Sequence, residues 1–543
     1  MINYSLTKKN IIPVEYLLML LFSALPLLLE LPYRVNIYLT WEGAYRMYLG
    51  QMPFRDFGIP LGYGFWLIPF IFFKIFGPYL FSLVLAQAFI NFCSFVLLNQ
   101  LLKLFEFTPV QRVLTLTVFA LSFVIVNFWP WYNHTAFVFE LAGLYFLCHY
   151  LITQKRVIYL PISAAFIALC FFTKQDAGGL SLLLCIALLV AFFIQTKSFK
   201  APLYFIVSYG LFMALLIVPL LGYDFTYWFN AGQHPHYSRI NSYDFITAFF
   251  EESLWIKFYL GALLVILLIR YKTPREFIAD KSFFIFTILT SGILVQALLI
   301  QVTSFSPVTV NYYFHTFGIG FAIFSLKDSI KFEKLGVAVL LFMAVFVWRS
   351  DQYWKYANRI LGKVMPSVFS PPPSNVVSKN SWSARDSTEY KPVIWENTSY
   401  KTLKRIKLPQ NTIEGIHKLM ELKSNAGDSE LNVLNMSNLT FLAYELGYTP
   451  ERGSHIPLWY HKGVAFFDRE EELLCRKIEE GTYDIVLFED MPDVDNFFPY
   501  AVRNCLIEHN YALVTKFISP TGYLTDSVEV YTRLKFIEKP ELP

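Results

Sequence analysis

Carboxylates and guanidinium groups alternate with aromatic residues in one short segment, residues 41–57. A carboxylate held near lipid can act as a general base, because desolvation raises its pKa while a nearby arginine lowers it. Glu42 and Asp56 are therefore candidate catalytic residues. The alternative is structural: Glu42 and Asp56 pair with Arg46 and Arg55 at the membrane interface, since ion pairs also perturb pKa values.

A second charged group is formed by Lys174, Gln175 and Asp176. A strongly hydrated ammonium group at a membrane surface is a point-charge partner for phosphate, which favours a binding role for Lys174. Gln175 and Asp176 would then line the same cavity. In the alternative interpretation, Lys174 extends to the membrane interface and pairs with Asp176.

Four further polar residues are candidates for lining a substrate cavity: Asn133, His134, Tyr312 and His315. A single histidine at the end of a membrane helix is more often hydrogen-bonded or interfacial than catalytic, so both interpretations are kept. The spacing of cysteine and histidine does not indicate a zinc site. A divalent metal therefore stays an open question.

Long apolar runs must position these residues. The chain has 543 residues, of which 55% are hydrophobic and only 16% charged, whereas an ordinary soluble protein has about 25% charged residues. This composition excludes a soluble enzyme, a disordered chain and a basic nucleic-acid-binding protein. We expect a polytopic α-helical membrane protein.

Runs of about 20 apolar residues, the length that crosses a bilayer, recur along residues 1–349. About eleven spans are predicted near 12–31, 80–102, 113–129, 135–152, 157–173, 179–196, 202–222, 255–270, 282–302, 313–326 and 335–349. With the N-terminus in the cytoplasm, most lysines and arginines of this part lie on the cytoplasmic side, as the positive-inside rule requires. The candidate residues then gather on the outer face.

The first outer loop, residues 32–66, carries the two candidate acids. The segment 60–77 is apolar but short and interrupted by glycine and proline, which predicts an interfacial or re-entrant helix. Clustered acids and bases at one face of the membrane indicate a polar cavity that opens outward.

The remainder of the chain is predicted to be a linker, 350–400, and a soluble extracytoplasmic α/β domain, 401–543. Helix patterns at 411–424, 438–446, 468–480 and 498–510 alternate with strand patterns at 431–435, 483–488, 511–518 and 528–533. No glycine-rich nucleotide motif follows a strand. Cys475 and Cys505 could pair only if this domain faces an oxidising compartment, and the sequence leaves that pairing open.

Four short stretches resemble the polyprenyl-phosphate-dependent glycosyltransferases of the C superfamily, which include the protein O-mannosyltransferases and the lipid A aminoarabinose transferases. They are Glu42-Gly43-Ala44-Tyr45, the G-Q-x-P-F-R-D-F run that ends at Phe57, Pro60-Leu61-Gly62, and the Thr173-Lys174 element with the glycines that follow it. In these families an acid just after the first span is catalytic or essential. Their usual Asp-Glu pair is here Trp41-Glu42, so the resemblance does not decide between Glu42 and Asp56 as the base.

The resemblance implies inverting transfer of a sugar from a polyprenyl-phosphate donor to a glycan, lipid or protein acceptor at the outer face of a membrane, such as a bacterial inner membrane. It implies that Lys174, Arg55 and Arg46 contact the donor phosphate. The alternatives are a transporter or flippase of lipid-linked saccharides and a non-catalytic membrane protein with a partner-binding tail. A transporter is expected to contain internal repeats, and none is evident.

Overall fold

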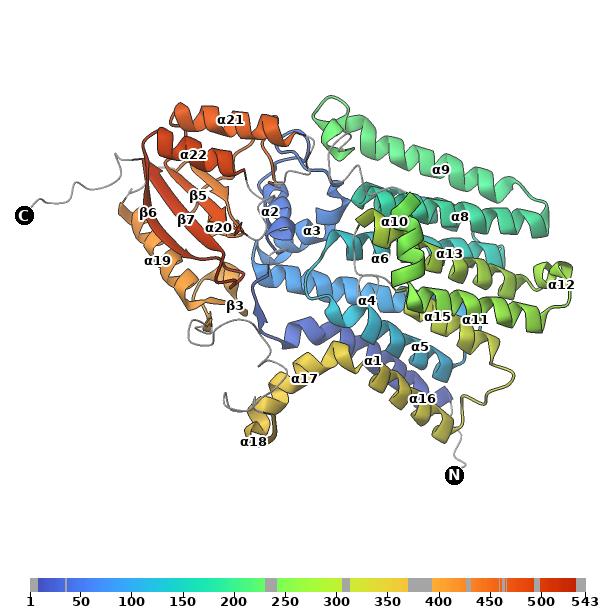
Figure 1. The fold of residues 1–543 in the computed structure, drawn as a ribbon. Helices are drawn as coiled ribbons and strands as arrows, with labels where there is room; N and C mark the ends of the chain where they lie inside the picture. Colours follow the sequence, from blue (N-terminus) through green and yellow to red (C-terminus); the bar gives the residue numbers. More distant parts are fainter. Residues whose placement is uncertain are drawn as a thin grey trace, which may run out of the picture.

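The computed structural model describes residues 8–34, 37–229, 242–304, 313–369, 393–425, 431–458, 460, 464, 466–492 and 499–533. A bundle of long helices occupies one end of the molecule, and a small part built of sheet and helices covers the other end (Figure 1). The elements labelled α2 and α3 lie between these two parts.

Every apolar segment predicted to span the membrane forms a helix. These helices are α1 (Lys8–Leu28), α4 (Leu80–Leu104), α5 (Pro109–Ser122), α6 (Tyr132–Thr153), α7 (Tyr159–Thr173), α8 (Gln175–Thr196), α9 (Lys200–Ile217), α11 (Leu254–Arg270), α13 (Lys281–Ser304), α15 (Phe314–Ser325) and α16 (Leu335–Trp348). Their number does not by itself give the number of spans. Among the described residues, six helices are long and apolar enough to cross a membrane, or up to eight if each of two bent helix pairs counts as one span.

The predicted first outer loop is a folded layer. It contains β1 (Leu31–Pro32), α2 (Ile37–Tyr48) and the 3-10 helix η1 (Tyr63–Trp66), which continues into α3 (Leu67–Phe76) in the place of the expected interfacial helix. Trp41 and Trp66 are completely buried in this layer. A Cβ atom on Gly43 would lie only 2.0 Å from the Trp66 ring, so glycine permits the close approach of α2 to η1.

The tail contains the predicted alternation of helices and strands. Its larger sheet has the order β4-β5-β7-β6, with β4 and β5 parallel and the other neighbours antiparallel. The elements are β4 (Val433–Met436), α20 (Leu442–Glu445), α21 (Phe467–Glu479), β5 (Ile485–Asp490), α22 (Tyr500–Glu508), β6 (Tyr511–Ile518) and β7 (Ser527–Arg533), preceded by β2 (Trp395–Asn397), η8 (Lys401–Leu403), β3 (Ile406–Pro409) and α19 (Gln410–Asn425).

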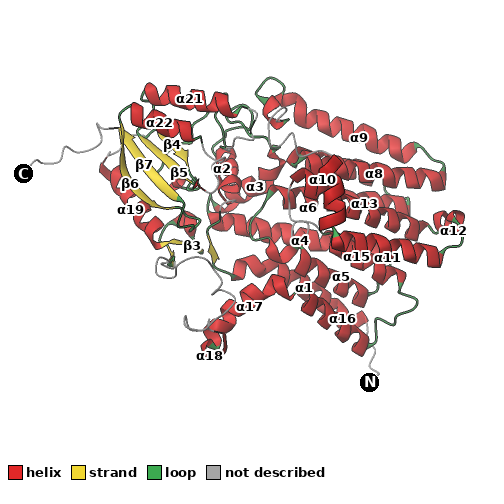
Figure 2. Cartoon of the chain, in the orientation of Figure 1, coloured by secondary structure: helices red, strands yellow, loops and turns green. Residues whose placement is uncertain are grey.

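Helices cover both faces of the larger sheet (Figure 2). Successive residues of β5 point to opposite faces, as strand geometry requires. Val486 and Phe488 pack with α21 and α22, whereas Ile485 and Leu487 belong to the core that contains α19. This sandwich is the α/β arrangement expected from the sequence.

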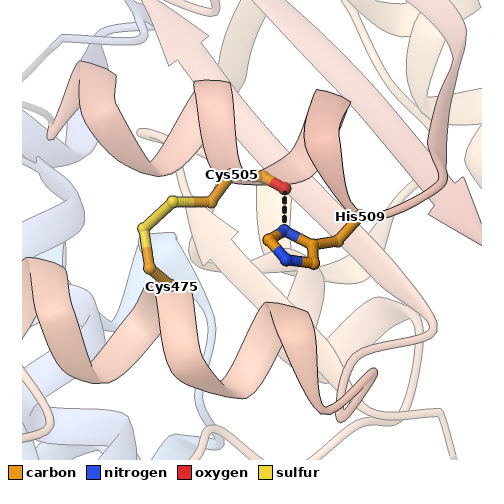
Figure 3. The surroundings of a disulfide bond; sticks show 3 residues. All are labelled: Cys475, Cys505 and His509. Carbon is orange, nitrogen blue, oxygen red and sulfur yellow. Dashed lines mark hydrogen bonds between the residues drawn. A yellow bond between two sulfur atoms is a disulfide. The ribbon is translucent and has the colours of Figure 1, made fainter.

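A disulfide bond joins Cys475 of α21 to Cys505 of α22, with their Cα atoms 5.6 Å apart (Figure 3). His509 Nδ1 lies 2.9 Å from the carbonyl oxygen of Cys505 at the end of α22. The structure therefore forms the pairing that the sequence left open.

The bundle and the tail share one hydrophobic core. Strand β1 pairs in parallel with β3, so that Leu31 lies opposite Ile406, and the resulting three-stranded sheet has the order β1-β3-β2. Side chains from the layer 31–83 and from strands of the tail belong to a single buried cluster. The tail is therefore packed directly onto one end of the bundle.

The segment 350–369, which we assigned to the linker, is helical: it forms α17 (Ser350–Val364) and α18 (Pro366–Phe369). Several short helices connect the longer ones. These are η2 (Val124–Val126), η3 (Val218–Leu220), η4 (Phe225–Trp228), α10 (Ser242–Thr247), η6 (Ala248–Glu252) and α12 (Pro274–Ala279).

Candidate active site

Helix α2 presents Glu42 and Arg46 one turn apart on the same face. The shortest distance between the guanidinium of Arg46 and the carboxylate of Glu42 is 2.8 Å, and both side chains are largely buried. The spacing of four residues brings these two groups together, as expected for a helix. The candidate acid Glu42 and the candidate phosphate ligand Arg46 thus form an ion pair with each other.

This pair faces the tail. The guanidinium of Arg46 donates hydrogen bonds to the side-chain oxygen of Gln51 (3.1 Å) and to the carbonyl oxygen of Glu451 (2.5 Å). Gln51 in turn donates to the carbonyl oxygen of Pro450 at 2.7 Å. Residues of α2 and of the tail therefore meet in a polar interface.

A small cavity, which we call the interface pocket, lies where the two parts meet. Its volume of about 20 Å³ is enough for one water molecule. It is lined by Glu42, Arg46, Val433, Leu434, Asn435, Thr440, Ala443, Tyr448, Pro450, Glu451, Ile456, Tyr460 and Leu474.

Burial raises the pKa of Glu42 above its ordinary value, and the charge and hydrogen bond of Arg46 oppose this effect only in part. A raised pKa means that the carboxylate has an increased affinity for a proton. Glu42 is thus a buried carboxyl group with an increased proton affinity that lines the interface pocket.

Asp56 lies in a different environment. Its side chain accepts hydrogen bonds from the backbone N–H of Met52 (2.8 Å) and from Arg55, whose guanidinium is 2.6 Å away. Burial alone would raise the pKa of Asp56, but these hydrogen bonds and the charges of Arg55 and Arg452 hold it below its ordinary value. Asp56 thus stabilises a turn as an ionised carboxylate.

Lys174 lies at the junction of α7 and α8 and is 7% exposed. Its Nζ atom is 3.1 Å from the carboxylate of Asp176, which also accepts a hydrogen bond from the hydroxyl of Thr303 (2.8 Å). The ring of Tyr132 is 5.8 Å from Nζ. We call Lys174, Asp176, Thr303 and Tyr132 the Lys174 cluster. The neighbouring Gln175 donates to the carbonyl oxygen of Trp228.

The layer 31–76 connects the Lys174 cluster to the interface pocket. A Cβ atom on Gly62 would lie 1.4 Å from the carbonyl oxygen of Phe172, so this layer touches the end of α7 directly. Tyr38 of α2 interacts electrostatically with both Glu42 and Tyr132, although burial is the main reason why its pKa is raised. Within the described residues, no hydrogen bond or ion pair joins Lys174 to Glu42 directly.

The other predicted cavity residues are distributed over the bundle. Asn133 and His134 lie in the first turn of α6, next to Tyr132, and are buried. His315, at the start of α15, is instead bonded through Nδ1 to the hydroxyl of Tyr259 at 2.9 Å. Tyr312 lies outside the described residues. Asn133 and His134 thus adjoin the Lys174 cluster, whereas His315 has separate surroundings.

Sequence reasoning missed two buried acids of the tail. Glu489, at the end of β5, accepts hydrogen bonds from the side chains of Ser519 and Asn438 and is completely buried. Glu470 accepts one from the hydroxyl of Tyr227 at 2.6 Å, which links the tail to the segment after α9. The only signal for Glu489 in the sequence is its position directly after the apolar run 483–488.

In the part of the chain that the structure describes, no group of three or more His, Cys, Asp or Glu side chains is arranged to hold a metal ion. The candidate site consists of carboxylates, cations and tyrosines. This donor set suits proton transfer and anion binding.

No protein-family model matches the sequence, and no curated protein matches it significantly. Two crystal structures of ArnT from Cupriavidus metallidurans are similar in fold. One, in the apo state, has 10% identity and a TM-score of 0.53 over 97% of this chain and 99% of that chain. The other, bound to undecaprenyl phosphate, has 10% identity and a TM-score of 0.51 over 96% of this chain and 97% of that chain.

The similarity extends over the helical bundle and the tail together, since almost the whole of both chains is covered. At this identity it establishes the fold. The fold that the resemblance of the short motifs implies is thereby confirmed: over almost its whole length the chain has the fold of ArnT.

Proposed function

We propose that this protein is a membrane glycosyltransferase that transfers a sugar from a polyprenyl-phosphate donor to an acceptor at the outer face of the membrane. The observation that carries the proposal is Glu42, a buried carboxylate with a raised pKa in a pocket between α2 and the tail. The shared fold with ArnT, which has been crystallised with undecaprenyl phosphate, supports the class of donor.

Glu42 is the proposed general base. It takes the proton from an acceptor hydroxyl while that oxygen attacks the anomeric carbon, and the bond from this carbon to the donor phosphate oxygen breaks with inversion. Asp56 is less suited to this role, because its hydrogen bonds to Arg55 and to the N–H of Met52 favour the ionised form and lower its basicity.

The donor phosphate is proposed to bind near Lys174. The ammonium group lies at the junction of two apolar helices, where a lipid-linked phosphate can approach from the bilayer. Arg46 and Arg55, the other predicted phosphate ligands, already pair with Glu42 and Asp56. Their proposed part is secondary: Arg46 adjusts the basicity of Glu42, and Arg55 stabilises the turn.

The interface pocket is too small for a sugar, since its volume is about 20 Å³ and small-molecule sites commonly measure about 300–1,000 Å³. The proposal therefore includes a movement of the tail relative to α2 when substrates bind. The acceptor, a glycan, a lipid or a protein, would enter along this interface.

The disulfide supports the proposed side of the membrane. Disulfide bonds persist in oxidising compartments such as the bacterial periplasm, so the Cys475–Cys505 bond favours an extracytoplasmic tail. We propose that the N-terminus is cytoplasmic and that the protein resides in an inner membrane of the bacterial type.

The test is reconstitution of the full chain in liposomes with a set of undecaprenyl-phosphate-linked sugars. Release of undecaprenyl phosphate, dependent on added acceptor extracts, is the expected result. Movement of the intact lipid-linked sugar across the bilayer without its cleavage would contradict the proposal and identify a flippase.

A further inference from the structure

Arg349 is a buried cation that the proposed reaction does not use. It lies between α16 and α17, is only 6% exposed, and its Nε and Nη2 atoms have no hydrogen-bond partner among the described residues. Asp351 lies two residues further on and acts on Arg349 through its charge, but its side chain is exposed, accepts a hydrogen bond from Gln352, and forms no ion pair with Arg349 among the described residues. Burying a guanidinium without an anion is costly, which indicates that a ligand anion completes this site.

His315 contributes a second donor to the same place. It is completely buried, and its Nε2 atom has no hydrogen-bond partner among the described residues. When the hydroxyl of Tyr259 donates to Nδ1, the neutral ring carries its proton on Nε2. The ring of Trp348 lies 5.0 Å from the ring of His315 and 5.3 Å from the guanidinium carbon of Arg349. Both donors therefore border Trp348.

An apolar groove begins at Trp348. It has a volume of about 340 Å³ and runs between α5, α15 and α16. Only apolar residues and Trp348 line it: Leu114, Val118, Ile319, Ala322, Ile323, Leu326, Ile330, Phe332, Leu341, Ala344, Val345 and Trp348. Trp348 thus lines the groove and also lies next to Arg349 and His315.

The groove lies at the edge of the bundle. Leu340, Met343 and Val347 of α16 are more than half exposed, which is expected for side chains that face lipid. In Figure 1, α16 lies on the opposite side of the bundle from α8, whose first turn follows Lys174. The groove is therefore separate from the proposed donor site.

We propose that this groove binds an anionic glycerophospholipid of the surrounding bilayer. One acyl chain fills the space between α5, α15 and α16, and the phosphate accepts hydrogen bonds from Arg349 and His315. Adjacent N–H groups of a guanidinium match two phosphate oxygens, and such charge-assisted bonds are stronger than neutral ones. The site holds α16 against the bundle and does not depend on the proposed transfer reaction.

The experiment uses the full chain in nanodiscs that contain equal amounts of phosphatidylglycerol and phosphatidylcholine, followed by native mass spectrometry of the lipids retained in detergent. The wild type is expected to retain phosphatidylglycerol about tenfold or more over phosphatidylcholine, and Arg349→Gln is expected to abolish this preference. Lys257→Gln removes a cation near the outer end of α11 and is the matched control, with an unchanged preference.

A second variant tests the groove itself. Ala344→Phe places a ring in the groove, so retention of both phospholipids is expected to fall together. Equal retention of the two phospholipids by the wild type would overturn the proposal, and this result does not depend on whether any variant folds. Displacement of phosphatidylglycerol by equimolar undecaprenyl phosphate would overturn the assigned occupant, because the groove would then be a carrier-lipid site.

Discussion

Glu42 and Asp56 look alike in the sequence, since each is an acid close to an arginine in an aromatic segment. In the structure the two carboxylates differ in their burial and in their hydrogen-bond partners. Glu42 is buried on α2 with one cation beside a pocket, whereas Asp56 accepts a backbone hydrogen bond in addition to its ion pair. As a result the pKa of Glu42 is raised and that of Asp56 is lowered. The two acids therefore have different proposed roles.

The first prediction concerns the pH dependence of activity. A general base acts in its deprotonated form, so the rate rises with pH through the pKa of Glu42. Arg46 lowers that pKa, and Arg46→Gln is therefore expected to move the acidic limb of the kcat/KM profile to higher pH. Arg55→Gln, which removes the cation beside Asp56, should leave this limb in place. An acidic limb that does not move in Arg46→Gln would contradict the role of the pair.

The second prediction concerns stability. Burial raises the pKa of Glu470 from 4.5 to about 8, so between these pH values the folded protein holds a proton that the unfolded chain releases. The free energy of unfolding should then fall as pH rises through this window, by up to about 1.4 kcal/mol per pH unit. Glu470→Gln stays neutral and should flatten this slope in melting experiments between pH 5 and about 8. A slope equal to that of the wild type would exclude Glu470 as its source.

At the scale of single residues, the sequence could indicate which charged side chains lie close to apolar segments. It could not show that Arg46 contacts the carbonyl oxygen of Glu451, since that contact joins positions 405 residues apart. Glu489 and Glu470 were missed for the same reason: their burial depends on partners such as Tyr227 that are distant in the chain.

At the scale of elements, local patterns predicted more. All four strands of the larger sheet and helices α19, α21 and α22 lie close to their predicted positions, because alternation and amphipathic spacing are local properties. The number of spans was less predictable. Helices such as α5 and α15 have 14 and 12 residues, shorter than the roughly 20 that cross a bilayer.

The folded layer 31–76 leads to the third prediction. Gly62 touches the backbone of Phe172, where a Cβ atom would be 1.4 Å from the carbonyl oxygen. Gly62→Ala is therefore expected to lower the free energy of unfolding by about 1–3 kcal/mol, as overpacking does. Gly179→Ala is the control, because its Cβ atom would meet only a ring edge at 3.7 Å. Equal melting temperatures for Gly62→Ala and the wild type would show that the layer does not pack as described.

The fourth prediction concerns α21 and α22. Replacing both Cys475 and Cys505 by serine removes a crosslink over 30 residues and should destabilise the tail by about 2–4 kcal/mol. Hydrogen exchange should show faster opening of these two helices in the variant. The pair of serines at Cys148 and Cys185, which are free thiols of the bundle, is the control and should leave exchange in the tail unchanged. Unchanged exchange in the Cys475–Cys505 variant would argue against the bond.

At the scale of the whole molecule, the tail and one end of the bundle form a single packed unit. Strand β1 precedes α2 in the chain and pairs with β3 of the tail, so the acid of α2 and the lining from the tail are held by one core. The apolar runs of the sequence predicted a membrane part in residues 1–349 and a separate domain after the linker. They could not reveal the shared core, because that core arises from long-range packing.

The same arrangement accounts for the position of the candidate site. The interface pocket is lined by residues of α2 and of the tail, and the Lys174 cluster lies at the junction of α7 and α8. A lipid-linked donor held by the bundle and an acceptor approaching along the tail would meet at α2. This placement is the basis of the proposed transfer from a membrane-bound donor to an acceptor that enters along the tail.

The central claim is that Glu42 is the base of a sugar transfer from a polyprenyl phosphate. The most direct measurement compares the wild type, Glu42→Gln and Asp56→Asn for release of undecaprenyl phosphate from the lipid-linked sugar that the wild type uses. Loss of a general base should lower the rate of Glu42→Gln by about 10²- to 10⁴-fold, while folded Asp56→Asn retains transfer. Wild-type rates for Glu42→Gln, with transfer lost instead in Asp56→Asn, would contradict the assignment.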